Sequence, residues 1–218
     1  MPETTTTTIA ASLTGVSKLY GSFAALRNLS LEIRAGECVM VLGENGAGKS
    51  TLLRMLAGLI RPTMGAVEVL GGDAEDQRSH IGYMSHAPML YDELTALENL
   101  RYYATLYGET GLLRAEDAIA QVGLSPEDTR LVGKYSQGMR QRCSLARVLM
   151  LQPKLLLLDE PFSNMDRASA LAMLDQLRGL RDSGATLVLT THQPELAASL
   201  ADETWHLRRG ELAVGARA

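Results

Sequence analysis

Residues 43–50 read Gly43-Glu44-Asn45-Gly46-Ala47-Gly48-Lys49-Ser50, and Thr51 follows them. This stretch fits the pattern G-x-x-x-x-G-K-[ST], in which glycines allow backbone N–H groups to turn inward and approach phosphate oxygens closely. Lys49 can reach the β- and γ-phosphates of a bound nucleotide, and the Ser50 hydroxyl can ligate Mg²⁺. We therefore expect residues 43–51 to form a phosphate-binding loop for ATP.

The sequence on either side of this loop supports the interpretation. Residues 38–42, just before it, are all apolar, as is typical of a short strand buried on both faces. Residues 50–58, just after it, contain helix formers, and the amino end of such a helix would add its positive dipole to the site. A glycine-rich turn without a ligand is the alternative, and the strand–loop–helix order disfavours it.

A second short run places two carboxylates together. Four leucines, residues 155–158, precede Asp159 and Glu160. An apolar run of this kind indicates a buried strand, and the ligands of open α/β sheets bind at the carboxyl ends of the strands. Alone, the pair could be a strand meeting solvent. Together with the upstream loop, it leads us to expect that Asp159 holds Mg²⁺ and that Glu160 orients or deprotonates the attacking water.

Strand and helix patterns alternate along the rest of the chain. Alternating or continuous apolar residues predict strands at 29–33, 67–69, 186–190 and, as a final edge strand, 204–207. Helical spacing of apolar residues predicts helices at 95–107, 115–122, 137–151 and, capped by Asp166, 167–182. Buried strands alternating with helices indicate an α/β fold with a mainly parallel sheet.

The bulk composition limits the possible classes of protein. A chain of 218 residues suffices for one well-buried domain, expected at 11–218, with a helical sub-domain at about 88–151 and a disordered tail at 1–10. The net charge of -4 gives no argument for nucleic acid as a partner. Cys38 and Cys143 lie in apolar sequence, so we expect buried reduced thiols, while a metal or disulfide role stays open.

A third motif narrows the choice among the many proteins that share such a phosphate loop. Residues 135–142 read Tyr-Ser-Gln-Gly-Met-Arg-Gln-Arg, and Ser136 lies 23 residues before Asp159. This motif resembles the signature of ABC ATPases, L-S-G-G-Q followed by a basic helix, although Gln137 replaces a glycine and Met139 replaces the glutamine. The resemblance implies an ABC ATPase cassette, a P-loop NTPase fold with additional antiparallel strands. It also implies that Ser136, Gln137 and Gly138 grip the γ-phosphate bound to a second copy.

Three more segments fit the same family. Residues 163–166 resemble its D-loop, which runs along the dimer interface. His192, which follows an apolar run, resembles the switch histidine that contacts the γ-phosphate, although a lone histidine after a strand is more often structural. Tyr20 matches the aromatic residue that stacks on adenine, and an ordinary loop tyrosine is the alternative.

One departure from the family pattern, in the Q-loop, suggests which substrate is transported. Residues 81–88 align with the Q-loop, but His86 stands where glutamine is usual, so an imidazole would approach the Mg²⁺-bound water. Together with Glu-Leu-Thr-Ala-Leu-Glu-Asn-Leu at 93–100, this histidine resembles the haem-exporter ATP-binding subunit of cytochrome c maturation. The variant at residues 135–139 is less like the signature of that subunit.

The resemblance implies an ATP-hydrolysing subunit that powers export by a separate multi-span membrane permease, as a homodimer peripheral to the cytoplasmic face of the membrane. The sequence contains no apolar run long enough for a membrane span, so a soluble chain is expected. Haem is the cargo that the His86 segment suggests. A small exporter of drugs, peptides or lipids and a soluble non-transport ABC ATPase are the alternatives. A nucleotide kinase would leave residues 135–142 unexplained.

Overall fold

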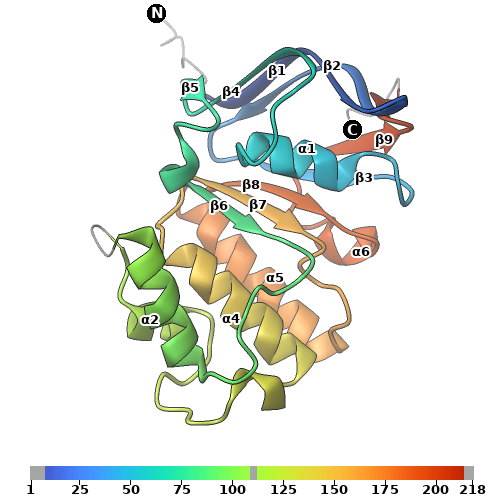
Figure 1. The fold of residues 1–218 in the computed structure, drawn as a ribbon. Helices are drawn as coiled ribbons and strands as arrows, with labels where there is room; N and C mark the ends of the chain where they lie inside the picture. Colours follow the sequence, from blue (N-terminus) through green and yellow to red (C-terminus); the bar gives the residue numbers. More distant parts are fainter. Residues whose placement is uncertain (1–7, 109–111, 214–218) are drawn as a thin grey trace, which may run out of the picture.

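Two sheets and a set of helices make up residues 8–108 and 112–213, the part of the chain that the computed structural model describes (Figure 1). The strands are β1 (Ile9–Tyr20), β2 (Phe23–Arg34), β3 (Cys38–Leu42), β4 (Met64–Val69), β5 (Gly72–Asp73), β6 (Ile81–Met84), β7 (Leu155–Asp159), β8 (Thr186–Thr190), β9 (Glu203–Arg208) and β10 (Glu211–Leu212). The helices are α1 (Lys49–Leu56), η1 (Arg78–His80), α2 (Ala96–Tyr107), α3 (Ala115–Gln121), η2 (Val132–Lys134), α4 (Gln137–Leu149), α5 (Arg167–Asp182) and α6 (Pro194–Ala197).

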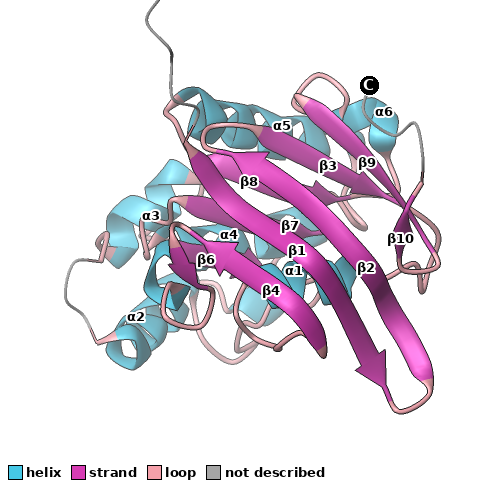
Figure 2. Cartoon of the chain, turned by 90° about the horizontal axis from the view of Figure 1, so that it is seen from above, coloured by secondary structure: helices cyan, strands magenta, loops and turns pink. Residues whose placement is uncertain are grey.

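The described strands form a four-stranded antiparallel sheet, ordered β2-β1-β4-β5, and a six-stranded sheet, ordered β10-β9-β3-β8-β7-β6. In the larger sheet β3, β6, β7, β8 and β9 are parallel, and the short strand β10 is antiparallel to β9. Figure 2 looks down on the antiparallel sheet, with the larger sheet behind it. The predicted α/β fold with a mainly parallel sheet and added antiparallel strands is confirmed.

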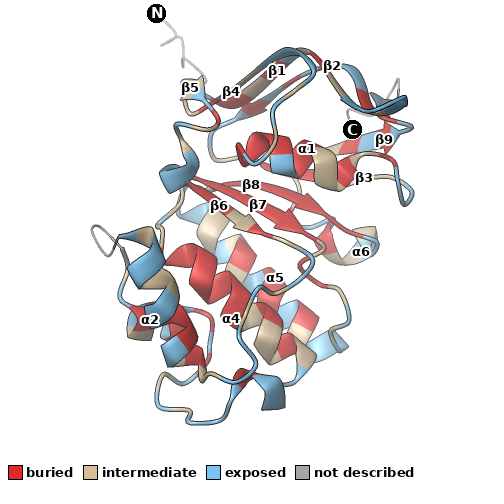
Figure 3. Ribbon diagram, in the orientation of Figure 1, coloured by how far each residue is buried: buried red, intermediate tan, exposed pale blue. Residues whose placement is uncertain are grey.

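Strand β7 shows why four leucines occur in a row. Helix α1 lies between the two sheets, whereas α4 and α5 cover the opposite face of the larger sheet (Figure 1). Leu155 and Leu157 belong to the core beside α1, and Leu156 and Leu158 belong to the core beside α4 and α5. Both faces of the strand are therefore buried, as Figure 3 shows, and alternation with polar residues disappears.

The helical segment between β6 and β7 begins with well-defined caps. Thr95 and Glu98 form a capping box at the start of α2, and Ser136 Oγ accepts a hydrogen bond from Met139 N at the start of α4. Asp166 caps α5 by accepting from Ser169 N, as its position predicts. The described part of residues 88–151 thus contains α2, α3, η2 and α4.

Two boundaries differ from expectation. Strand β1 begins at Ile9, inside the expected disordered tail at 1–10, because Ile9 pairs with Arg34 and the next two alanines are buried. Residues 1–7 of that tail lie outside the described part. The strand expected at 204–207 is not an edge, because β10 pairs with its outer side.

Both cysteines are free and buried, as expected. Burial raises the pKa of the Cys38 thiol and of the Cys143 thiol to about 12. Both thiols therefore stay protonated and unreactive at neutral pH. Within residues 8–108 and 112–213, every helix is either too short or too polar to cross a bilayer.

Candidate active site

A cavity of about 490 Å³ lies at the carboxyl ends of β3, β7 and β8, where an α/β sheet is expected to bind its ligands. It brings together most of the residues that the sequence singles out. Its lining consists of Tyr20, Phe23, Ala25, Glu44, Asn45, Gly46, Ala47, Gly48, Lys49, Ser50, Thr51, His86, Asp159, Glu160, Ser163 and His192.

Glycine is favoured at each of the three glycine positions of the phosphate loop for a different structural reason. Gly48 has φ 108° and leaves no space for a side chain, since a Cβ there would lie 2.5 Å from the Ala25 carbonyl oxygen. Gly43 has φ 154° and its missing Cβ would clash with the Leu207 carbonyl oxygen, so it lies behind the cavity rather than in its lining. Gly46 has open space around it, and its φ of 79° alone favours glycine.

Lys49 and the start of α1 make this end of the cavity positive. The Lys49 side chain is buried, and its Nζ donates to the Gly43 carbonyl at 2.6 Å and the Glu44 carbonyl at 3.2 Å. Gly48 caps α1 without any side-chain hydrogen bond, so the N–H groups of the first turn are left for a ligand. A helix amino end combined with an ammonium group is a built site for phosphate.

The two carboxylates also line the cavity and have different surroundings. Asp159 ends β7, is buried, and accepts a hydrogen bond from Thr190 Oγ1 at 2.8 Å. Glu160 follows with φ 57°, a left-handed conformation that turns the chain out of the strand. Its backbone N–H donates to the same Thr190 Oγ1 at 3.0 Å.

His192 lies against Glu160. The backbone N–H of His192 donates to Glu160 Oε2 at 3.0 Å, and His192 Nε2 lies 3.3 Å from Glu160 Oε1. That second contact is close but lacks hydrogen-bond geometry, so Glu160 Oε1 is a buried oxygen without a hydrogen-bond partner. A buried acceptor without a partner, on a residue that lines the cavity, fits a site that receives a water molecule.

The residues present fit Mg²⁺. The Ser50 hydroxyl and the Asp159 carboxylate both line the cavity and are hard oxygen ligands. Among the described residues, His, Cys, Asp and Glu side chains form no group of three or more that could hold a metal on their own. Mg²⁺ typically takes one or two protein ligands together with phosphate oxygens and waters. His86 is exposed and also lines the cavity.

The aromatic end of the cavity comes from the β1–β2 hairpin. Tyr20 pairs with Phe23 across the turn, and the two side chains are 48% and 60% exposed. Lys18 Nζ lies 5.3 Å from the centroid of the Tyr20 ring. Sequence reasoning missed Phe23, together with Ala25, because only the hairpin pairing brings them beside the phosphate loop.

The signature residues Ser136, Gln137 and Gly138 are absent from the lining of this cavity. Gly138 is instead required by packing, because a Cβ there would lie 2.6 Å from Ser169 Oγ at the start of α5. Gln137 occupies the first position of α4 and is only partly buried. The replacement of the other signature glycine by glutamine is therefore compatible with the local packing.

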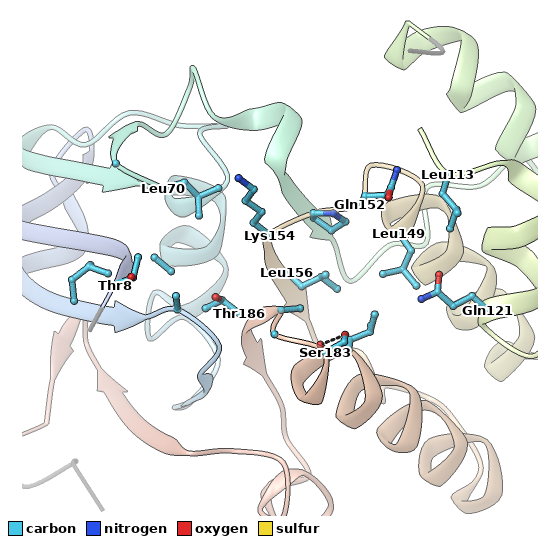
Figure 4. A pocket seen from close by; sticks show the side chains of 18 residues that line it. Thr8, Leu70, Leu113, Gln121, Leu149, Gln152, Lys154, Leu156, Ser183 and Thr186 are labelled. Atoms are coloured by element: carbon cyan, nitrogen blue, oxygen red, sulfur yellow. Dashed lines mark hydrogen bonds between the residues drawn. The ribbon is translucent and has the colours of Figure 1, made fainter. Parts of the chain in front are cut away.

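A larger cavity, of about 870 Å³, lies far from this chemistry. It is formed at the amino ends of β7 and β8, where Figure 4 shows Lys154, Leu156 and Thr186. Asp159, Glu160 and Lys49 take no part in its lining. Size alone therefore does not identify the reactive site.

Comparisons with known proteins agree on the family. Residues 26–163 match the family model described as "ABC transporter". The chain is 37% identical over 205 residues to the uncharacterized ABC transporter ATP-binding protein YxlF of Bacillus subtilis, covering 92% of this chain and 68% of that protein. It is also 37% identical over 217 residues to the Nod factor export ATP-binding protein I of Rhizobium johnstonii, covering 96% and 70%.

A solved structure agrees in fold. The ATP-binding cassette MJ0796, described as a dimer in a post-hydrolysis state bound to ADP and Pi, superposes with a TM-score of 0.83 at 28% identity. The match covers 93% of this chain and 96% of that one.

Proposed function

Because the chain belongs to the ABC transporter family as an ATP-binding subunit with ATPase activity, we propose that it powers transport through a separate membrane permease. One observation carries the assignment of the reaction site. The amino end of α1, the buried Lys49 and the two carboxylates at the end of β7 converge on a single cavity.

Each lining residue has a proposed role. The backbone of the lining residues Glu44, Asn45, Gly46, Ala47 and Gly48, with Gly43 behind them, binds the phosphates of ATP together with Lys49, Ser50 and Thr51. Tyr20 stacks on the adenine ring. Ser50 and Asp159 would hold Mg²⁺, and His86 would meet one of its waters. When bound, Mg²⁺ neutralises charge on the phosphates.

Glu160 is the proposed positioning group for the attacking water. Its unpartnered oxygen Oε1 accepts from that water, and its charge favours removal of a proton as the water attacks the γ-phosphate. His192 is held beside it by the bond from its own backbone N–H and contacts the γ-phosphate. Lys49 supplies positive charge to the same phosphate.

A second copy of the chain completes the proposed site. Ser136, Gln137 and Gly138 lie outside the cavity of their own chain, although they begin a helix whose amino end suits a phosphate. A homodimer would place them on the ATP of the partner. The dimeric cassette among the structural relatives supports this arrangement.

The cargo is a narrower proposal. We propose export, which the relative named for Nod factor export supports, at the cytoplasmic face of the membrane. We propose haem as the first cargo to test, on the strength of His86 and residues 93–100 alone. Exporters of drugs, peptides or lipids are the alternative, and the unusual signature at residues 135–139 favours keeping them in the test.

The deciding experiment is capture of the native complex from membranes with a tagged chain, followed by identification of the bound proteins. A multi-span permease is expected. Reconstitution of that complex in vesicles should then give ATP-dependent export that Glu160→Gln abolishes, with haem and a lipid tested as separate cargoes. Recovery of the chain only with soluble proteins would contradict the transport role.

A further inference from the structure

One buried hydroxyl connects both carboxylates of the cavity. Thr190 ends β8, and its Cα is the register partner of Asp159 in β7. Its side chain is 0% exposed. Thr190 Oγ1 lies 2.8 Å from Asp159 Oδ1 and 3.0 Å from Glu160 N. Thr190 itself does not line the cavity, so it contacts the two residues from behind.

The direction of each hydrogen bond follows from the donors available. The backbone N–H of Glu160 can only donate, so the Thr190 oxygen accepts there. The single hydroxyl hydrogen of Thr190 is then free for Asp159, whose ionised carboxylate can only accept. The hydroxyl therefore has one arrangement that satisfies both hydrogen bonds, and this arrangement fixes the position of Asp159 Oδ1.

The backbone at Glu160 explains why an acceptor is needed at this point. Strand β7 ends at Asp159, and Glu160 has φ 57°, so its N–H leaves the ladder of the sheet. A buried N–H without a partner is costly, and a left-handed conformation persists only where its surroundings hold it. Thr190 Oγ1 supplies both the partner and the restraint.

We propose that Thr190 is a positioning residue that sets the orientation of the Asp159 carboxylate for Mg²⁺ and of the Glu160 side chain for the attacking water. The inference rests on the proposed roles of Asp159 and Glu160. Groups that orient metal ligands in this way typically change metal affinity or activity by about 10–100-fold when they are removed.

The test compares three substitutions in the full chain. Thr190→Val keeps the shape and removes the hydroxyl, Thr190→Ser keeps the hydroxyl, and Thr186→Val is the matched control. Thr186 lies in the same strand, is 2% exposed and accepts a hydrogen bond from Gly36 N at 3.0 Å, but it lines the remote cavity of Figure 4.

Two readouts are needed. The ATP affinity is measured at equilibrium in EDTA and at increasing Mg²⁺ concentrations. In EDTA, the affinity of Thr190→Val should equal that of the native chain. With Mg²⁺, Thr190→Val should need about tenfold more metal for the same metal-dependent change in ATP affinity. Its kcat should fall about tenfold or more. Thr190→Ser should restore both quantities to within about threefold, and Thr186→Val should leave both unchanged despite losing a partly buried hydrogen bond.

Contrary outcomes separate this inference from the proposed function. A native Mg²⁺ requirement and kcat in Thr190→Val would overturn the inference, as would equal losses in Thr190→Ser or in Thr186→Val. Asp159→Asn serves as the reference. If Asp159→Asn also keeps the native Mg²⁺ requirement, the proposed role of Asp159 fails, whereas an impaired Asp159→Asn beside a native Thr190→Val defeats the role of Thr190 alone.

Discussion

The backbone N–H of His192 donates a hydrogen bond to Glu160 Oε2 at 3.0 Å, and the His192 imidazole Nε2 lies 3.3 Å from Glu160 Oε1. The backbone of His192 therefore holds Glu160 Oε2 in place, while the imidazole of His192 faces Glu160 Oε1. Because the backbone bond does not depend on the imidazole, the orientation of Glu160 and the chemistry of His192 can be separated by substitution.

Glu160→Gln should bind ATP normally and hydrolyse it slowly. The amide keeps an oxygen for the His192 N–H but loses the charge that activates water, and a positioned general base contributes about 10²–10⁴-fold to the rate. Single-turnover hydrolysis and equilibrium ATP binding measure the two effects. Glu68→Gln, an exposed carboxylate on β4, is the control. Native turnover in Glu160→Gln would remove Glu160 from this role.

Lys49→Ala should lose ATP binding. The Lys49 ammonium is buried and held by two carbonyl oxygens of the loop, so its removal takes away both the charge for the phosphates and the link across the loop. The ATP affinity should fall at least about tenfold, as expected for loss of a charge-assisted contact in a partly buried site. Equilibrium binding checks this, with exposed Lys154→Ala as control. An unchanged affinity would show that the phosphates bind elsewhere.

Ser136→Asp should block an ATP-dependent dimer without unfolding the chain. Aspartate is as good a helix cap as serine, so the bond to Met139 N can persist. Its negative charge would face the γ-phosphate bound to the partner and repel it. Light scattering of Glu160→Gln with and without ATP should show a doubling of mass that Ser136→Asp removes. A dimer that survives this substitution would exclude Ser136 from the interface.

Gly138→Ala should destabilise the fold, although alanine normally favours a helix. The added Cβ would lie 2.6 Å from Ser169 Oγ, and overpacking of this kind costs about 1–3 kcal/mol, more than the gain of up to about 1 kcal/mol from helix propensity. Urea unfolding should show a smaller loss when the same change is made in a Ser169→Gly background. Gly179→Ala, at an exposed position of α5 with open space around it, should stabilise the chain instead. Equal effects at both glycines would refute the packing argument.

The sequence predicts best those features that have a local physical cause. The leucine run of β7 follows from burial on both faces, and the cap Asp166 follows from the hydrogen bond that its own side chain accepts. The loop at 43–51 and the pair Asp159–Glu160 carry chemistry in their residue types, so they too could be found before the fold was known.

Features that depend on pairing across the sheets could not be found in this way. Phe23 enters the cavity only because it pairs with Tyr20, and β10 is two residues long, too short for any periodic pattern. Ile9 joins β1 because of its partner Arg34, not because of its neighbours. Thr190 reads as one more residue of a buried strand until its distance to Asp159 is known.

The phosphate loop also contacts the backbone of both sheets. Gly48 is pressed against the Ala25 carbonyl of β2, in the antiparallel sheet, and Gly43 against the Leu207 carbonyl of β9, in the larger sheet. Both contacts are backbone to backbone, so neither can yield by rotating a side chain. A displacement of one sheet relative to the other would therefore act on the loop through these two contacts.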